Sequence, residues 1–357
     1  MSHYYPTLER YNNSLDHCIE KDLRMRVLVT GAAGFIGSQV AARFSRDGNT
    51  VIGVDNFTSY YPADLKRLRV QELLTPLGIS VKELNLDNFD DVESLFDEYN
   101  PEVVVHLAAQ PGVRLSGREM HNYVTNNLLA FGNVLLASTN RNVEAFIYAS
   151  SSSVYGDQAV MPFKESGMFL VPNSFYGATK LANEVLASSL AGKFQTRIRA
   201  LRFFTVYGPY GRPDMAYFRI ATSLLTDSKF ELFGDGSIRR DFTYINDAID
   251  CVSLLVNQLL TENPGFSDIV NLGGGKPASM LDLIGVSESI SGKKLRYSIS
   301  SPNSSDVSMT YSDSSYLRQL IGRAPSTTVE DGMTQVINWC LRPDTRERLQ
   351  NWIIGTL

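Results

Sequence analysis

Short apolar runs alternate with amphipathic segments through the first half of the chain. The runs are rich in β-branched residues and span about five residues, which is typical of strands buried in a parallel sheet. The expected strands are residues 25–30, 50–54, 81–86, 103–108, 144–148 and 197–204. The expected helices are residues 38–44, 63–74, 90–98, 123–140 and 176–193. Strands separated by helices predict an α/β fold with a doubly wound parallel sheet.

The pattern changes after residue 205, where glycine, proline and charged residues become denser, as in 207–214 and 234–241. We expect residues 206–357 to form a smaller C-terminal α/β substrate domain, with some segments returning to the first domain. Residues 25–205 form the larger domain in this division. Residues 1–24 are a polar extension without the apolar stretch of a secretory signal.

A glycine-rich turn, Gly31-x-x-Gly34-x-x-Gly37, directly follows the first expected strand, and the next strand leads into Asp55. Such glycines allow backbone N–H groups to approach a pyrophosphate at a helix N-terminus. Asp55 comes 24 residues after Gly31, where a carboxylate can accept hydrogen bonds from the adenosine ribose. This context predicts a Rossmann-type dinucleotide site. No arginine directly follows Asp55, which favours NAD over NADP.

Tyr176 and Lys180 are four residues apart on an expected helix, and a serine run that ends at Ser153 precedes them. Positions i and i+4 share one helix face, so we expect the ammonium to lower the pKa of the phenol towards neutrality. Tyr176 would then be a general base for a hydroxyl group, with Ser151 bonded to the same oxygen. Alone, the pair is also compatible with an ordinary amphipathic helix, and the serine run with an ordinary polar loop.

Composition narrows the class of protein. The net charge of −5 and the absence of a basic block argue against nucleic acid or an anionic membrane as partner. Three scattered cysteines fit reduced thiols in the cytoplasm, and four dispersed histidines do not suggest a metal site. No apolar run approaches the length of a membrane span.

Several motifs together resemble the extended short-chain dehydrogenase/reductase superfamily. They are the glycine turn, His106-Leu-Ala-Ala109, Ser150-Ser-Ser-Ser-Val-Tyr-Gly156, Tyr176-x-x-x-Lys180 and Arg240-Asp-Phe-Thr-Tyr244. Within it, the segments 202–216 and 109–114 are similar to the UDP-glucuronate 4-epimerases. The resemblance covers residues 25 to about 342. It implies epimerisation of a UDP-sugar at C4 through a 4-keto intermediate, with tightly bound NAD.

The resemblance also implies roles for individual residues. Ser151, Tyr176 and Lys180 are the expected catalytic residues. The expected cofactor-binding residues, besides Tyr176 and Lys180, are Gly31, Gly34, Phe35, Ile36, Gly37, Asp55, Asn56, Asn85, Leu86, Leu107, Ala108 and Ala109. The expected substrate-binding residues are Arg114, Ser152, Ser153, Thr205, Arg212, Arg240, Asn303 and Asp306. Asn85 replaces a more usual Asp, and 303–306 replaces a more usual Gln-Pro-Gly-Asp. An exposed ion pair with Asp241 is the other reading of Arg240.

Single residues separate neighbouring activities. The related dehydratases carry an Asp-Glu pair where Ser152 and Ser153 stand, and the UDP-glucuronate decarboxylases carry Glu at the second position. UDP-galactose 4-epimerases typically have Asn where Thr205 lies. Decarboxylation, epimerisation of a neutral UDP-hexose such as UDP-glucose or UDP-GlcNAc, and a non-catalytic NAD-sensing module remain alternatives. We further expect a homodimer, because the helices at 123–140 and 176–193 form dimer bundles in relatives.

Overall fold

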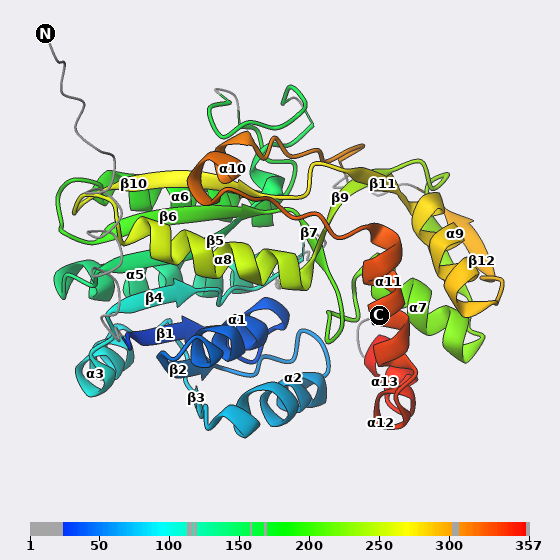
Figure 1. Ribbon diagram of the computed structural model, residues 1–357, viewed down its shortest axis with the longest axis horizontal. Coiled ribbons are helices and arrows are strands. Elements are labelled where there is room, and N and C mark those ends of the chain that lie inside the picture. Colours follow the sequence, from blue (N-terminus) through cyan, green and yellow to red (C-terminus); the bar gives the residue numbers. More distant parts are fainter. Residues whose placement is uncertain are drawn as a thin grey trace, which may run out of the picture.

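A seven-stranded parallel sheet forms the centre of the larger lobe (Figure 1). The computed structural model describes residues 24–112, 117, 120–157, 159–167, 170–301 and 307–354. The strand order is β10-β6-β5-β4-β1-β2-β3. Their bounds are β1 Arg26–Thr30, β2 Thr50–Asp55, β3 Val81–Glu83, β4 Val103–His106, β5 Ala145–Ser151, β6 Arg197–Phe203 and β10 Ser267–Leu272.

Alternate residues of these strands enter two separate hydrophobic cores, because side chains of a strand point to opposite faces in turn. Val27, Val29 and Val105 pack towards helices α1 (Phe35–Arg46), α2 (Ala63–Arg69) and α8 (Ile245–Leu259). Leu28 and Val104 pack towards α3 (Phe89–Tyr99), α5 (Ala130–Asn140) and α6 (Phe175–Leu190). Burial on both faces explains why the strands read as continuous apolar runs, and it confirms the expected doubly wound α/β class.

Helix ends and strand lengths differ from the expectation in several places. The segment expected as one helix at 63–74 is α2 followed by a π-helical turn, Val70–Leu74, and a 3-10 turn, Thr75–Leu77. The helix expected at 123–140 begins earlier, with α4 (Met120–Tyr123), and contains a π turn at Val124–Leu129 before α5. The helix expected to end at residue 193 ends at Leu190, and β3 stops at Glu83. Terminal turns depend on tertiary contacts that periodicity does not contain.

The smaller lobe, on the right of Figure 1, combines two small sheets with a helical layer. One sheet has the order β11-β9-β7, and the other pairs β12 with β8. Their bounds are β7 Thr205–Tyr207, β8 Phe230–Phe233, β9 Arg239–Tyr244, β11 Pro277–Ser279 and β12 Tyr297–Ser300. The remaining helices are α7 Ala216–Thr226, α9 Met280–Ser291, α10 Ser315–Ile321, α11 Val329–Cys340, α12 Pro343–Arg346 and α13 Leu349–Ile354.

An aromatic cluster holds the C-terminal helices of this lobe to α7. The rings of Trp339 and Trp352 stack 5.9 Å apart, and Phe218 contacts both.

Strand β10 was not expected from the sequence. It lies beyond the proposed boundary at residue 205, yet it pairs with β6 in the large sheet.

Candidate active site

The turn after β1 is shaped by close backbone contacts that only glycine permits. Gly31 has φ +70°, and a Cβ there would lie 2.8 Å from the Ala108 nitrogen. A Cβ on Gly37 would lie 2.0 Å from the Gly31 carbonyl oxygen, while the Gly34 N–H donates to that oxygen over 2.9 Å. Gly34 caps α1 without a side-chain hydrogen bond. The first turn of α1, which contains Phe35 and Ile36, therefore presents backbone donors to an anion.

Asp55 lies at the end of β2, beside this turn. Its carboxylate accepts the Ala33 N–H over 3.1 Å and the Phe57 N–H over 2.8 Å. The Lys66 ammonium lies 3.4 Å away and donates also to Thr58. Lys66 was not expected from the sequence, since only the residues directly after Asp55 were considered. Helix α2 brings Lys66, 11 positions later in the chain, back to Asp55.

Two further groups of expected cofactor residues lie at neighbouring strand ends. The Asn56 amide donates to the Asn85 side chain over 2.8 Å, so these two residues form a unit. Leu86 is buried, and its carbonyl accepts from Asn133. Leu107, Ala108 and Ala109 follow β4 and are partly exposed. The first two donate to Thr30 through their N–H groups, which places them against the glycine turn.

Ser151, Tyr176 and Lys180 meet at the end of β5. Ser151 lies close enough to the Tyr176 phenol to lower its pKa, and the Ser151 oxygen accepts the Ser153 N–H over 3.1 Å. Ser174 caps α6 by accepting the Gly177 N–H, which fixes where the helix starts and thus where Tyr176 lies. Lys180 donates to the Ala149 carbonyl over 2.9 Å and lies 5.8 Å from the Tyr176 ring.

We expected Lys180 to lower the pKa of Tyr176 towards neutrality, and this prediction is wrong for the protein without bound ligands. Burial raises the pKa of Tyr176 above its ordinary value of 10.0, and the charge of Arg212 and the bond with Ser151 offset only a part of that. Burial also lowers the pKa of Lys180 to about 8. The reason for the difference is desolvation, which disfavours the charged form of both groups and which helix spacing does not reveal. Tyr176 remains partly accessible, as a base for a bound hydroxyl must be.

The expected substrate residues are only partly gathered. Ser152 and Ser153 form a 3-10 turn with Val154 directly after Ser151, and Thr205 begins β7; all three side chains are partly exposed. Arg212 pairs with Asp214 and lies 5.9 Å from the centre of the Tyr60 ring, and its charge is one of the influences that lower the pKa of Tyr176. Arg114, Asn303 and Asp306 lie outside the described residues.

Arg240 lies on β9 and donates to its neighbour's carbonyl. Asp241 is fully buried, and its carboxylate accepts the backbone N–H groups of Gly274, Gly275 and Ser312. The alternative interpretation of Arg240, an exposed ion pair with Asp241, is therefore wrong.

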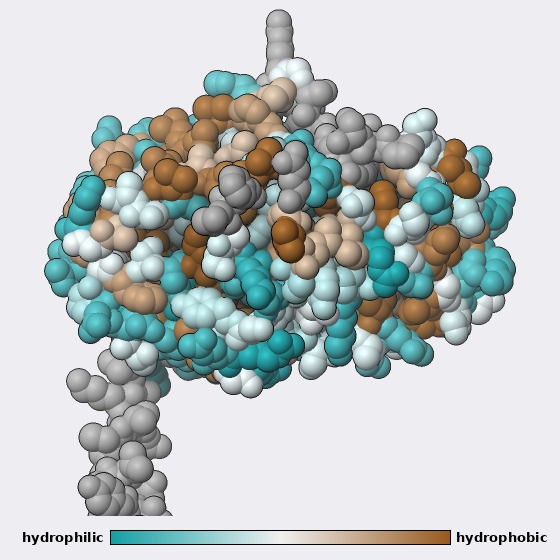
Figure 2. All heavy atoms as spheres, turned by 90° about the horizontal axis from the view of Figure 1, so that it is seen from above, coloured by the Kyte–Doolittle hydropathy of each residue, from teal (hydrophilic) through white to brown (hydrophobic). Residues whose placement is uncertain are grey.

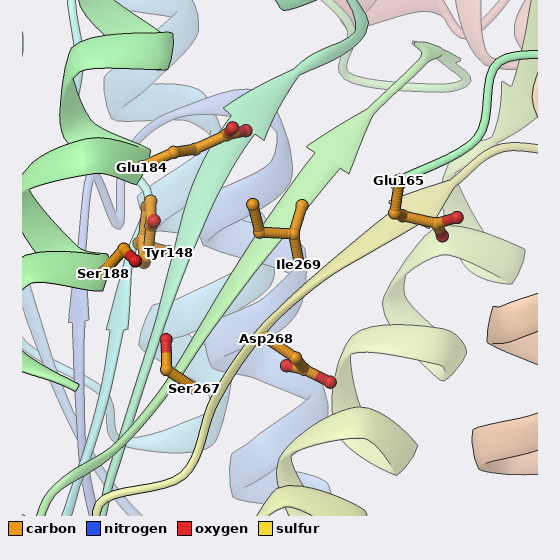
Figure 3. Close-up of a pocket in the computed structure, with 7 residues that line it drawn as sticks. All are labelled: Tyr148, Glu165, Glu184, Ser188, Ser267, Asp268 and Ile269. Carbon is orange, nitrogen blue, oxygen red and sulfur yellow. The ribbon is translucent and has the colours of Figure 1, made fainter. Parts of the chain in front are cut away.

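A buried ion pair behind the serine run was missed. Glu184, two turns after Tyr176, accepts two hydrogen bonds from Arg202 over 2.9 and 2.8 Å and one from Ser150 over 2.5 Å. Glu184 also lines a hollow of about 300 Å³, with Glu165 and Asp268 (Figure 3). These three carboxylates already have protein partners, since Asp268 binds Arg199 and Glu165 accepts the Asn271 N–H. The polar groups of the hollow are therefore satisfied by the protein itself.

Comparison with known proteins identifies the family to which these motifs belong. A family model described as "NAD dependent epimerase/dehydratase family" matches residues 27–273. This chain belongs to that family. The match begins in β1 and ends just after β10, so it includes the glycine turn, Asp55, and the Ser151, Tyr176 and Lys180 cluster.

Several similar proteins are described as UDP-glucuronate 4-epimerases. A UDP-glucuronate 4-epimerase of Thermodesulfobacterium geofontis is 35% identical, over 87% of this chain and 95% of the relative. Arabidopsis thaliana UDP-glucuronate 4-epimerase 2 is 37% identical, over 88% of this chain and 75% of the relative. The crystal structure of Bacillus cereus UDP-glucuronic acid 4-epimerase in complex with UDP-glucuronic acid and NAD is 35% identical, with a TM-score of 0.81 over 88% of this chain and 98% of that one.

Proposed function

We propose that this family member epimerises C4 of a UDP-sugar, converting UDP-glucuronate to UDP-galacturonate through a transient 4-keto sugar with NAD bound throughout. The observation that carries the proposal is the grouping of Ser151, Tyr176 and Lys180 at the end of β5, with Ser152 and Ser153 following directly. Its support from similar proteins is that relatives described as UDP-glucuronate 4-epimerases match 87% and 88% of this chain.

The chain offers a cradle that fits a dinucleotide. The pyrophosphate would lie against the N-terminus of α1, which no side chain caps, in a turn whose close backbone contacts leave no room for a Cβ at Gly31 or Gly37. Asp55 would accept from the adenosine ribose, and Asn56 and Asn85 would lie near the adenine. Leu86 and residues 107–109 would line the same channel. Bound NAD supplies a reversible acceptor for the hydride of C4.

The residues of this chain then handle the proton and the position of the sugar. Tyr176 takes the proton of the 4-hydroxyl when C4 is oxidised and returns it when C4 is reduced. Ser151 donates to the same oxygen, and Lys180 lies next to the phenol to stabilise its ionised form. The keto sugar turns about its diphosphate link and presents its opposite face. Binding must therefore be firm at UDP and looser at the sugar.

The acidic sugar and its diphosphate require cationic and neutral donors. We assign Arg114, Arg212 and Arg240 to the diphosphate and nearby anionic groups, because guanidinium groups bind phosphate and carboxylate oxygens in a fork. We assign Asn303 and Asp306 to the uridine. We assign Ser152, Ser153 and Thr205 to the carboxylate. A 4-keto glucuronate is a β-keto acid that loses CO₂ when its C5–C6 bond aligns with the ketone, so these hydroxyls must hold the carboxylate out of that alignment.

Product analysis tests the proposal in one experiment. The purified protein is incubated with UDP-glucuronate, and the products are identified by NMR. The expected product is UDP-galacturonate. A UDP-pentose would indicate a decarboxylase, and turnover of UDP-glucose or UDP-GlcNAc alone would indicate a neutral-sugar epimerase. No turnover of any of these, with NAD bound, would leave the NAD-sensing module. Tyr176→Phe should abolish turnover and leave NAD bound.

The serine at position 153 gives a second, finer test. Ser153→Glu places a carboxylate where the decarboxylases carry one, so the share of UDP-pentose should rise relative to UDP-galacturonate. Ser153→Ala is the matched control, since it removes the hydroxyl without adding a charge. An unchanged product ratio in Ser153→Glu removes this residue from the control of decarboxylation.

We also propose a cytoplasmic homodimer that supplies galacturonate units for polysaccharide biosynthesis. The exposed apolar residues on one helical layer are Val124, Leu129, Leu136, Phe175, Val185 and Leu186. Figure 2 shows hydrophobic residues gathered over the far side of the larger lobe, where α5 and α6 lie in Figure 1. Such a face is commonly covered by a second copy. Buried, unpaired Cys251 and Cys340 fit a reducing compartment. No helix within the described residues has the length and apolar character of a membrane span.

A further inference from the structure

Arg69, the last residue of α2, is a fully buried arginine that joins two segments far apart in the chain. Its Nη1 donates to the Ala33 carbonyl in the glycine turn over 3.2 Å and to the Tyr61 hydroxyl over 2.7 Å. Its Nε donates to the Tyr210 carbonyl over 2.8 Å, and its Nη2 donates to the Gly211 carbonyl over 3.0 Å. Since the guanidinium is a rigid planar fork, these bonds fix the spacing between the glycine turn and the loop after β7.

The glycine turn is the rigid side of this bridge. The Ala32 N–H donates to the Val54 carbonyl over 3.0 Å. The Ala33 N–H donates to the Asp55 carboxylate over 3.1 Å. The turn is therefore fastened to β2 by bonds of its own, and it keeps these bonds when Arg69 is replaced.

The loop after β7 is the side whose shape needs support. Tyr210 has φ +62°, a left-handed backbone conformation that is unfavourable for a residue with a Cβ. Its hydroxyl donates to Glu72 over 2.7 Å, and the Gln39 side chain donates to the Pro209 carbonyl over 3.3 Å. Together with Arg69, side chains of α1 and α2 thus hold three successive carbonyls of the loop. Without these bonds the strained backbone is free to relax.

Arg212 follows directly after this supported stretch. Its Nε donates to Oδ1 of Asp214 over 3.0 Å, so the ion pair lies within the loop and moves with it. The Tyr60 hydroxyl, from the loop after β2, makes only a long hydrogen bond of 3.4 Å to Asp214. The shorter bonds from Arg69 to the backbone before Arg212 are therefore the firmer link between this cation and the glycine turn.

We propose that Arg69 is a positioning residue for the sugar nucleotide: it binds the backbone directly before Arg212 and so sets where the Arg212 guanidinium meets the diphosphate. The inference rests on the proposed function only in the role of Arg212 as a diphosphate ligand. Arg69 is fully buried, so it acts on a ligand through the backbone that it holds. Its partners are neutral, and burial of a charge is costly, so directed hydrogen bonds are what this side chain contributes.

Binding of UDP to the purified NAD-containing protein, measured by calorimetry, tests the inference without turnover. In Arg69→Met we expect the Kd for UDP to rise about 10-fold, the effect of losing one hydrogen bond to a charged group. The NAD content should stay unchanged, because the glycine turn has its own bonds. Arg69→Lys keeps the charge but cannot bond the turn and both loop carbonyls at once, so its Kd should rise as well. Full affinity for UDP in Arg69→Lys overturns the role of the fork.

A double-variant cycle decides whether Arg69 acts through Arg212. Arg212→Gln should weaken UDP binding, and the addition of Arg69→Met should then cause no further loss, because two residues that act through one contact are not additive. Gln39→Ala frees the Pro209 carbonyl alone and should raise the Kd by a smaller factor. Additive losses in the cycle, or an unchanged Kd in Arg69→Met or in Arg212→Gln, overturn the inference.

Arg199 provides a matched control for the loss of a buried fork. Its guanidinium is equally buried, and its partners Asp268 and Leu255 lie on β10 and α8. Arg199→Met should lower the melting temperature and leave the Kd for UDP unchanged. An equal rise of the Kd in Arg199→Met would mean that general destabilisation weakens binding, which overturns the inference. If Arg69→Met does not fold, the same comparison is made with Arg69→Lys.

Kinetics separate this inference from the function on which it rests. With UDP-glucuronate, Arg69→Met should raise KM by a larger factor than it lowers kcat, because the catalytic serine, tyrosine and lysine lie on β5 and α6. If UDP binding follows the expected order but UDP-glucuronate is not epimerised, the proposed function fails and the inference stands. If UDP-glucuronate is epimerised and the losses in the cycle are additive, only the inference fails.

Discussion

Replacement of Glu184 by Gln should destabilise the protein far more than an exposed ion-pair variant does. Glu184 is 4% exposed and Arg202 is 1% exposed, and the pair holds two hydrogen bonds between them. Gln keeps the size of the side chain, but it leaves the guanidinium of Arg202 buried without a counter-charge. Removing one partner of a buried pair costs about 3 to 5 kcal/mol in the free energy of unfolding.

The expected change in melting temperature follows from the length of the chain. About 2.1 cal/mol/K per residue over 357 residues gives an unfolding entropy of about 0.75 kcal/mol/K. A loss of 3 to 5 kcal/mol then lowers the midpoint by about 4 to 7 °C. Circular dichroism on samples of equal NAD content measures this shift, and denaturant titration measures the free energy.

The chain offers a matched control on its surface. Glu98 bonds Lys82 over 2.5 Å, but both side chains are more than one-third exposed. Glu98→Gln should therefore change the free energy of unfolding far less than Glu184→Gln does. The double variant Glu184→Gln with Arg202→Met removes the buried charge as well and should recover a part of the loss. Equal effects of Glu184→Gln and Glu98→Gln, or no recovery in the double variant, would refute the reasoning.

Three further outcomes are expected. Gly37→Ala should release NAD, seen as lost cofactor absorbance after gel filtration, because its Cβ would meet the Gly31 carbonyl at 2.0 Å. Gly285→Ala, in α9 at a helical position with open space, is the control that tests whether the loss comes from the turn alone. Val185→Lys should shift the protein from dimer to monomer in sedimentation, since Val185 is 63% exposed on the proposed interface. The buried Lys180 has its pKa lowered from 10.5 to about 8, so the unfolded chain binds more protons between these values and stability should rise with pH there; Lys180→Met should lose that rise in pH-dependent denaturation.

Much of the candidate site was readable from local sequence because it is built at strand ends. Each strand is an apolar run with a defined end, and parallel strands bring those ends to one edge. The glycine turn, Asp55 and Ser151 could be placed in this way. Strand β10 was missed, since nothing near it in the sequence shows with which strand it pairs.

The chain pattern by itself determined the class of fold, the dinucleotide turn and the Tyr176–Lys180 spacing, because each depends on residues less than one supersecondary unit apart. Only the tertiary structure decided the electrostatics. Lys66 meets Asp55, and Glu184 meets Arg202, through folding of separate segments. Burial, which sets the pKa of Tyr176, is a property of everything that surrounds the phenol, and no spacing along one helix contains it.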